Sequence, residues 1–293
     1  LLNEVLRCEN IELREHTTLL DFFADASACG GVIAAGPDGE PRAIGAGSVV
    51  LACGGIGGLY KNSTNFPHIT GDAIAMALRH GVACEHLDYI QIHPTTLYSH
   101  RKGRRFLISE SVRGEGALLL DKNGNRFTNE LQPRDVVSAA IRAQMEKDGT
   151  EHVWEDMRPI GEAAIREHFP NILERCEEEG YDPIHEPIPV VPAQHYFMGG
   201  ITADLSSRTA LPRLYACGET CCNGVHGRNR LASNSLLESL VFAQRAADDI
   251  LYGEPPVFTG DKPDLAPYRE QEPLFAAYWQ EVLTAIERSK NHE

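Results

Sequence analysis

The segment from His226 to Glu238, HGRNRLASNSLLE, places a cation beside the expected start of a helix. Ser235 and Glu238 have the S-x-x-E spacing of a capping box, and apolar residues follow at helical spacing. The free N–H groups at such a helix start suit a phosphate, a carboxylate or an electron-rich ring. Arg230 can clamp a carboxylate. An ordinary surface helix with a good cap is the alternative, because a capping box alone carries no chemistry.

Two short apolar runs that end in glycine predict buried parallel strands. Residues 49–52 read VVLA and are followed by Gly54 and Gly55, whereas residues 214–217 read LYAC and are followed by Gly218. Ligands collect at the carboxyl ends of parallel strands, so we expect these glycine turns to lie at one site. Two unrelated core strands are the alternative.

Two helices and one extended segment are predicted between these strands. The first helix begins at residue 70 or 72 and ends at 81, and the second covers 133–149. Arg134 lies at the positive end of the second helix, where the macrodipole disfavours a cation, so helix stability does not explain its position. The proline-rich run 184–192 cannot continue a helix and leads toward His195.

Composition excludes several classes of protein. Lys plus Arg is 27 and Asp plus Glu is 42, a net charge of −15, which argues against nucleic acid and anionic membranes as partners. No apolar run reaches the ~20 residues of a membrane span, so we expect a cytoplasmic protein. Eight cysteines without a C-x-x-C pair indicate reduced thiols and no metal site. A redox or metal role for the cluster Cys217, Cys221 and Cys222 stays an open alternative.

Both ends of the chain suggest an internal fragment of a longer protein. The first residue is Leu1 rather than Met. Residues 273–290 carry apolar side chains near helical spacing, and no later element follows that would cover them. We therefore expect the apolar face of this last helix to lack a cover.

Several motifs together resemble one family. They are TGDAIAMA (70–77), QIHPTTLY (91–98), SESVRGEGA (109–117), PRDVVSAAI (133–141), PIPVVPAQHYFMGGI (187–201), LYACGE (214–219) and HGRNRLASNSLLESLVF (226–242). In this order they resemble the flavoproteins of the fumarate reductase and succinate dehydrogenase superfamily. ASNSLLE, VPAQHY and HFPNILERCEEEGYD are most similar to its L-aspartate oxidase branch.

The resemblance implies an α/β fold in which an incomplete Rossmann-like FAD-binding domain is interrupted by an α+β substrate-capping domain. The implied boundaries are 1–86 and 198–255 for the FAD-binding domain, 87–197 for the capping domain, and 256–293 for the start of a C-terminal helical domain. The G-x-G-x-x-G loop of the family is absent, since GGIGG at 54–58 lacks its spacing. We therefore expect FAD to bind this fragment weakly or not at all.

The resemblance implies roles for those residues of this chain that match the family's motifs at the positions of its site residues. The substrate-binding positions match His93, Ser109, His195 and Arg230, and the flavin-binding positions match Asp72, Glu219, Ser235 and Leu236. Ser109 is a departure, because relatives usually carry Thr there, and the lost methyl group loosens the pocket. Asp72 has an alternative role as a helix N-cap.

The resemblance assigns the removal of the substrate proton to Arg134, with Glu110 and Arg113 as a relay to solvent. An arginine is an unusual base because its unperturbed pKa exceeds ~12. A dry site with other cations nearby lowers that pKa, and Glu110 accepts the proton onward. Two alternatives stay open: Arg134 only binds and polarises the substrate, and Glu110 forms a structural ion pair with Arg113.

The implied function is the oxidation of L-aspartate, or a related C4 dicarboxylate, to iminoaspartate. This is the first step of the quinolinate route to NAD, with quinolinate synthase as the functional partner and oxygen or fumarate as the electron acceptor. A fumarate reductase or succinate dehydrogenase flavoprotein subunit is one alternative. A folded module without cofactor and without activity is another.

Overall fold

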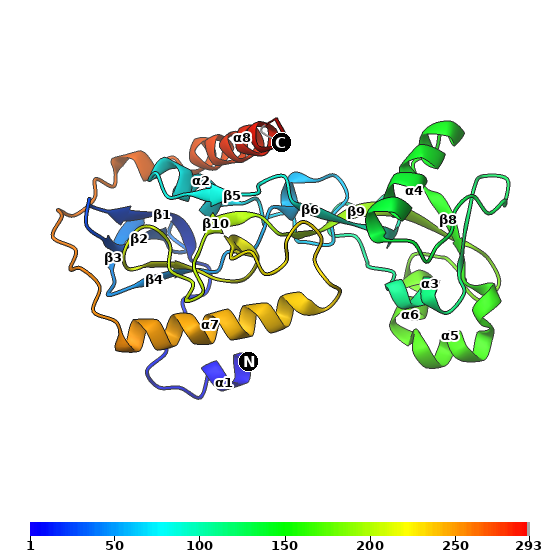
Figure 1. The fold of residues 1–293 in the computed structure, drawn as a ribbon, viewed down its shortest axis with the longest axis horizontal. Coiled ribbons are helices and arrows are strands. Elements are labelled where there is room, and N and C mark those ends of the chain that lie inside the picture. The colour runs from blue at the N-terminus through cyan, green and yellow to red at the C-terminus, as the bar shows by residue number, and fades with distance from the viewer. Residues whose placement is uncertain (292–293) are drawn as a thin grey trace.

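The computed structural model describes residues 1–291 as a mixed α/β chain with two lobes (Figure 1). The strands are β1 (Thr18–Ala24), β2 (Cys29–Ala35), β3 (Pro41–Gly45), β4 (Val49–Leu51), β5 (Cys84–Glu85), β6 (Ile90–Leu97), β7 (Leu118–Leu120), β8 (Val153–Asp156), β9 (Ile188–Phe197), β10 (Gly200–Thr202), β11 (Leu214–Ala216) and β12 (Cys221–Cys222). The helices are α1 (Leu2–Val5), α2 (Asp72–Arg79), α3 (Glu110–Gly114), α4 (Arg134–Asp148), α5 (Glu162–His168), α6 (Pro170–Glu178), α7 (Asn234–Tyr252) and α8 (Gln271–Lys290). The α/β class predicted from the sequence is confirmed, and the sheets are small.

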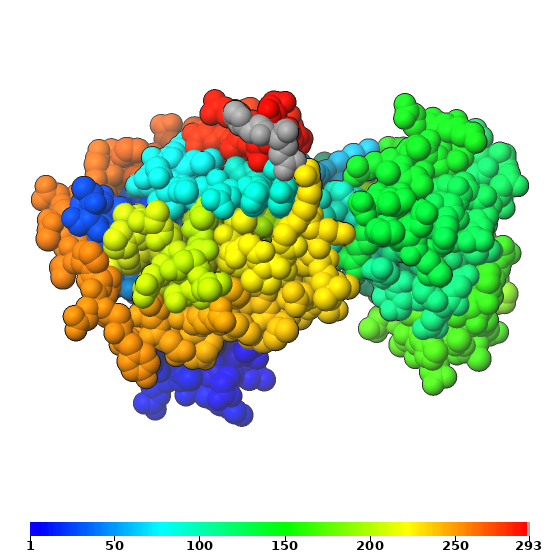
Figure 2. Space-filling view, in the orientation of Figure 1, coloured from blue at the N-terminus to red at the C-terminus, as the bar shows by residue number. Residues whose placement is uncertain are grey.

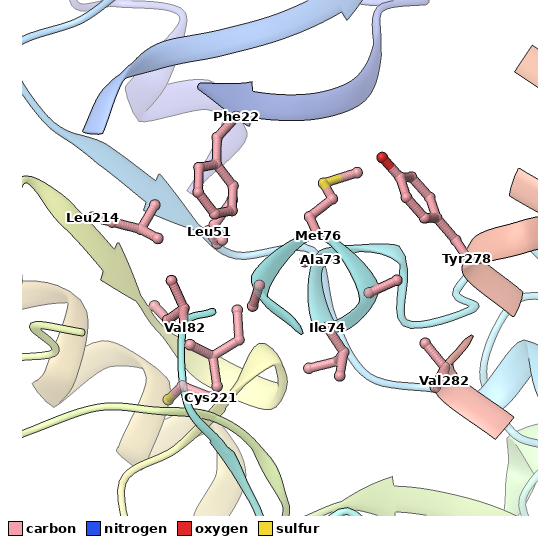
Figure 3. Close-up of a cluster of buried hydrophobic side chains, with 14 of the residues drawn as sticks. Phe22, Leu51, Ala73, Ile74, Met76, Val82, Leu214, Cys221, Tyr278 and Val282 are labelled. Carbon is pink, nitrogen blue, oxygen red and sulfur yellow. The ribbon is translucent and has the colours of Figure 1, made fainter. Parts of the chain in front are cut away.

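The large lobe contains β1–β5, β10–β12, α2, α7 and α8. An antiparallel meander of β1, β2 and β3 lies at one end, and α7 and α8 lie on opposite sides of the lobe (Figure 1). The apolar side chains of α2 lie in the core, where Met76 points toward Phe22 and Tyr278 and Ile74 points toward Val282 (Figure 3). This core includes residues of β4 and β11 and so fixes the positions at which these two strands end.

The two glycine-terminated runs form neighbouring parallel strands, as the sequence predicted. β4 pairs with β11, and Val49 lies opposite Leu214 while Leu51 lies opposite Ala216. Both strands therefore end at the same edge, and the predicted glycine turns follow there. The alternative of two unrelated core strands is wrong.

The small lobe consists of α3–α6 packed on the sheet β6–β9–β8–β7. β6 and β9 are long antiparallel strands that run from the large lobe into this sheet, and the green lobe stands apart from the main body in Figure 2. Its separate core gathers Ile108, Leu119, Ile141 and Ile188. The domain boundaries expected from the sequence stay a prediction.

The two predicted helices are confirmed with small shifts at their starts. α2 is preceded by Gly71, which has a φ of 81° and acts as its N-cap, so the alternative N-cap role of Asp72 is wrong. α4 begins at Arg134 after Pro133 and ends at Gly149, whose φ of 67° is the left-handed conformation that glycine adopts freely. The extended segment before His195 is also confirmed as part of β9.

The expectation that the last helix lacks a cover is wrong. Tyr278, Val282 and Ile286 of α8 are buried in the core of the large lobe, where they pack against α2 (Figure 3). The Tyr278 hydroxyl also donates a hydrogen bond of 2.7 Å to the carbonyl of Leu20. Within residues 1–291, no helix combines the length and the apolar content needed to cross a bilayer.

Candidate functional site

The carboxylate of Glu219, which follows β11, lies beside the end of β9. Its Oε1 accepts hydrogen bonds from the backbone N–H of Phe197 at 2.9 Å and from Nδ2 of Asn65 at 3.5 Å. Burial raises the pKa of Glu219 to about 7, against the opposing effect of these hydrogen bonds. A Cβ added at Gly55 would lie 2.5 Å from the same oxygen, so only glycine fits there beside Glu219.

Two histidines from β6 and β9 face each other. His93 is buried and its ring centroid lies 5.4 Å from that of His195, in an edge-on arrangement. The Nδ1 atom of His195 is 2.9 Å from the hydroxyl of Thr64. Burial, together with Arg230 and Arg134, lowers the pKa of His195 to about 4, and burial lowers that of His93 well below its usual range. Both imidazoles are therefore neutral near pH 7. The Nδ1–H of His93 donates to the carbonyl of Thr95 at 2.9 Å, which leaves its Nε2 as a hydrogen-bond acceptor.

Arg134 projects from the first turn of α4 toward the same place. Its Nη1 donates to Oε1 of Gln91 at 3.1 Å, and its Nε donates to Oε2 of Glu110 at 2.7 Å. The Gln91 amide in turn donates to the carbonyl of Arg230 at 2.8 Å. Gln91 thus connects two arginines of the site. The sequence carried a signal for Gln91, because it lies two residues before His93 on the same face of a strand.

Arg230 is buried beside the start of α7. Its guanidinium carbon lies 4.5 Å from the ring centroid of Tyr196, and its Nη1 donates to the hydroxyl of Ser235 at 3.4 Å. Its Nε has no hydrogen-bond partner. Burial and the nearby charge of Arg134 both lower the pKa of Arg230. A buried cation with an unsatisfied donor and a second cation nearby is suited to an anionic ligand.

The structure therefore brings together four of the predicted residues, His93, His195, Arg134 and Arg230, which we call the basic cluster. They come from β6, β9, α4 and the loop before α7. Gln91 links Arg134 to the backbone of Arg230, and the ring centroids of His93 and His195 lie 5.4 Å apart. The two arginines supply donors that match two carboxylates, and the two neutral histidines add uncharged polar groups beside them.

Ser109 and Arg113 occupy the two ends of α3, next to the basic cluster. Ser109 is the N-cap of α3, and its Oγ accepts from the N–H of Ser111 at 3.3 Å. Arg113 is buried, and its Nη1 donates to the carbonyl of Glu130 at 2.6 Å. Glu110 is hydrogen-bonded to Arg134 and not to Arg113, so the alternative of a Glu110–Arg113 ion pair is wrong.

The capping box predicted at the start of α7 is wrong, although the helix begins within one residue of Ser235. The N-cap is Ser233, which has a φ of 64° and makes no side-chain cap. Glu238 is buried and its carboxylate accepts from Asn223 instead of turning back to the helix start. The first N–H groups of α7 are consequently left for a ligand, and Leu236 is 76% exposed beside them.

The cysteines do not form a metal site. All eight are free, and within residues 1–291 no group of three His, Cys, Asp or Glu side chains is placed to hold a metal ion. Burial raises the pKa of Cys217 and Cys222, which disfavours their reactive thiolate form. The structure thus gives no support to the redox or metal alternative for this cluster.

Curated relatives and solved structures resemble the chain over most of its length. L-aspartate oxidase of Clostridium perfringens is 51% identical over 251 residues, covering 85% of this chain and 57% of that protein. L-aspartate oxidase of Streptomyces coelicolor is 44% identical over 260 residues, with coverages of 84% and 45%. A quinol-fumarate reductase structure with menaquinol matches with a TM-score of 0.77 and 34% identity over 94% of this chain and 51% of that chain. The chain thus spans about half the length of the relatives it matches.

The residues at the strand ends fit a flavin cofactor. Ala52 and Cys53 are exposed after β4, and Gly54, with a φ of 78°, turns the chain there. The N–H groups of α7 and Arg230 suit the negative charge of a flavin ring or a phosphate. Asp72, whose pKa burial raises, lies at the first turn of α2 and receives a hydrogen bond of 2.7 Å from Thr70.

The family model of the FAD binding domain matches residues 1–236, which include the two parallel strands, β6, β9 and all four members of the basic cluster. FAD is accordingly the cofactor to which this arrangement corresponds. The match covers well over half of the chain, and the chain belongs to the FAD-binding domain family.

Proposed function

We propose that the protein catalyses the FAD-dependent oxidation of L-aspartate to iminoaspartate. The observation that carries this proposal is the basic cluster, in which two arginines and two neutral histidines converge beside the start of α7. L-Aspartate carries two carboxylates, and a pocket that orients it needs cationic or donor groups at both ends. The relatives named L-aspartate oxidase support this choice of substrate.

The proposed roles follow from the contacts. Arg230 and Arg134 bind the two carboxylates, and His195 donates a hydrogen bond to one of them. His93, whose Nδ1–H donates to the Thr95 carbonyl, offers its Nε2 as an acceptor. Ser109 provides a further hydroxyl from the α3 cap. FAD, when bound, accepts the hydride from the substrate. Asp72, Glu219, Ser235 and Leu236 are the residues that we propose to hold it.

Arg134 is the proposed proton acceptor, with Glu110 as its route to solvent. The Glu110 carboxylate is 48% exposed and lies 2.7 Å from Nε of Arg134, so it can exchange protons with both the arginine and water. A purely electrostatic role, in which Arg134 only binds and polarises the substrate, is the alternative. The two roles differ in kcat, because loss of a proton acceptor costs typically 10²–10⁴-fold.

The decisive test is substitution of Arg134 in the FAD-loaded enzyme of full length. Arg134→Leu is expected to lower kcat for L-aspartate by at least about 10²-fold. Arg142→Leu, an exposed arginine on the same helix, is the matched control and is expected to keep its activity. If Arg134→Leu retained most of its turnover, the role of Arg134 would fail.

Structural similarity to quinol fumarate reductases favours one second candidate, a fumarate reductase or succinate dehydrogenase flavoprotein subunit. Hydrogen peroxide formed only with L-aspartate supports the oxidase, whereas dye reduction only with succinate supports the second candidate. A purified chain without the visible absorbance of a flavin would instead support the module without cofactor.

The proposed setting is NAD biosynthesis. Iminoaspartate is the substrate that a quinolinate synthase consumes, and oxygen or fumarate takes the electrons. A cytoplasmic location agrees with the eight free cysteines. An assay for iminoaspartate formation from L-aspartate in the cytosolic fraction of cells tests the proposed reaction and the proposed location together.

A further inference from the structure

The hydroxyl of Thr64 is a buried group that touches the basic cluster and that the roles above do not use. Its Oγ1 lies 2.9 Å from Nδ1 of His195 and 3.4 Å from the carbonyl oxygen of Gln194. Thr64 precedes α2, whereas His195 and Gln194 belong to β9, so the contact joins segments that are 131 residues apart. It occupies Nδ1 and leaves only Nε2 of the His195 ring for a ligand.

The segment that carries Thr64 is fixed against β9 by hydrogen bonds on both sides of Gln194. The N–H of Gln194 donates to the carbonyl of Asn62 at 2.9 Å, and the N–H of Thr64 donates to the carbonyl of Gln194 at 2.9 Å. The Ser63 hydroxyl donates to Oε1 of the Gln194 side chain at 2.7 Å. The Thr64 hydroxyl is therefore held beside the imidazole ring by contacts of its own backbone and of its neighbours.

The distances indicate the direction in which the hydrogen bond between Thr64 and His195 runs. The Thr64 hydroxyl has one proton, so it donates either to Nδ1 of His195 or to the Gln194 carbonyl. The contact of 2.9 Å lies within the usual range for a hydroxyl donor, whereas the contact of 3.4 Å exceeds it. The Gln194 carbonyl also accepts the backbone N–H of Thr64 already. The hydroxyl therefore donates to Nδ1.

Donation from Thr64 places the single proton of the neutral His195 ring on Nε2. Burial lowers the pKa of His195 to about 4, so the ring is neutral near pH 7. A neutral imidazole carries one N–H, and the hydrogen bond at one nitrogen decides whether the other bears the proton. His93 has the opposite arrangement, because its Nδ1 donates to the carbonyl of Thr95 at 2.9 Å. The two facing rings thus offer one donor and one acceptor.

We propose that Thr64 is a positioning residue, which fixes His195 as the Nε2–H tautomer and so makes this histidine a donor to a substrate carboxylate. The inference rests on the proposed function. With the proton on Nδ1, Nε2 would turn a lone pair toward the carboxylate, and the two would repel each other. The carboxylate is present in the substrate and in the transition state alike, so the effect is expected in KM and not in kcat.

The first arm of the test determines the tautomer of His195 in this chain. Histidine labelled with nitrogen-15 gives separate NMR signals for the protonated and the bare ring nitrogen, and the signals of His195 are those lost in His195→Gln. The protonated nitrogen is expected to be Nε2 in the unsubstituted chain and in Thr64→Ser, which keeps the hydroxyl. Thr64→Val has nearly the same shape but no donor, so the Nδ1 signal should move.

Two results of this arm overturn the proposal. One is a proton on Nδ1 of His195 in the unsubstituted chain, which needs no variant to fold. The other is a set of His195 ring signals that stays the same in Thr64→Val.

The second arm measures L-aspartate oxidation by the FAD-loaded enzyme of full length. Thr64→Val is expected to raise KM about tenfold and to leave kcat within about twofold, while Thr64→Ser keeps both values. Thr96→Val is the matched control, because it also removes a buried hydroxyl, one that donates to the Val191 carbonyl at 2.8 Å. The control should leave KM unchanged. An unchanged KM in Thr64→Val, or an equal rise of KM in Thr96→Val, overturns the proposal.

Failure of the proposed function is recognised separately. If the unsubstituted enzyme does not oxidise L-aspartate, that function fails, while the ring-nitrogen signals still show whether Thr64 sets the tautomer. Succinate then serves as the dicarboxylate probe. Weaker binding of succinate to Thr64→Val than to Thr64→Ser supports the role of Thr64, and equal binding overturns it.

Discussion

Substitution of Glu219 by glutamine is expected to stabilise the protein increasingly as the pH rises above about 5, with the full effect above pH 7. The Glu219 carboxylate is partly buried between Gly55, which follows β4, and the end of β9, where its Oε1 accepts from the N–H of Phe197. Glutamine has nearly the same shape, and its carbonyl oxygen can accept the same hydrogen bond. The variant thus changes the charge of the group while preserving its contacts.

The size of the expected stabilisation follows from the pKa of Glu219. Burial raises the pKa of Glu219 from 4.5 to about 7, so the folded protein binds this proton more tightly than the unfolded chain does. Stability therefore falls as the pH rises from about 4.5 to about 7, and the full loss is reached above pH 7. At roughly 1.4 kcal/mol for each pH unit, the loss is about 3 kcal/mol, which Glu219→Gln removes.

Urea unfolding at pH 5 and pH 8 measures this effect. At pH 5 the two proteins should have similar free energies of unfolding, whereas at pH 8 the variant should be more stable by up to about 3 kcal/mol, or about 6–12 °C in Tm. Glu177→Gln is the exposed control and should show no such pH dependence. Equal differences between Glu219→Gln and the unsubstituted protein at both pH values would refute the reasoning.

Three further substitutions test the packing and the pocket. Gly55→Ala places a Cβ 2.5 Å from the Glu219 carboxylate, so it should lower the free energy of unfolding, measured in urea, by about 1–3 kcal/mol. The loss should be much smaller in a protein in which Glu219 is also replaced by alanine. Tyr278→Phe removes the hydrogen bond to the buried Leu20 carbonyl and should lower the free energy of unfolding by about 1–2 kcal/mol. Thermal denaturation measures this loss, and an unchanged Tm would contradict the expected role of the hydrogen bond. Ser109→Thr restores a methyl group to the pocket and should lower KM for L-aspartate by up to about fourfold, whereas an unchanged or higher KM would speak against a loosened pocket.

Local patterns predicted those elements whose ends are decided by local backbone conformation. Helix α4 begins and ends where Pro133 and Gly149 indicate, because proline suits a helix start and glycine adopts the left-handed conformation at its end. The parallel pair of β4 and β11 followed from two apolar runs that each end in glycine, although Val50 in the middle of β4 is exposed. These features need no knowledge of distant parts of the chain.

The failures came from contacts between distant segments. Glu238 was expected to cap α7, but Asn223 binds its carboxylate in the folded protein. The cover of α8 is α2, which precedes it by some 200 residues, and no periodicity within α8 reveals it. In each case tertiary structure supplied a partner that sequence spacing cannot show.

The residues of the site could be predicted as a group only from the family resemblance, because no local sequence pattern connects them. Arg134, Arg230, His93 and His195 come from four separate elements, and each alone has an ordinary structural reading. The two arginines concentrate positive charge, and the two histidines add neutral polar groups, in a chain whose net charge is −15. Glu110, the carboxylate paired with Arg134, is half exposed, whereas Arg230 lies against an aromatic ring and keeps an unpartnered Nε. A buried arginine whose Nε lacks a hydrogen-bond partner is stabilised by an anionic ligand, and the dicarboxylate that we propose as substrate would supply such charge at both arginines.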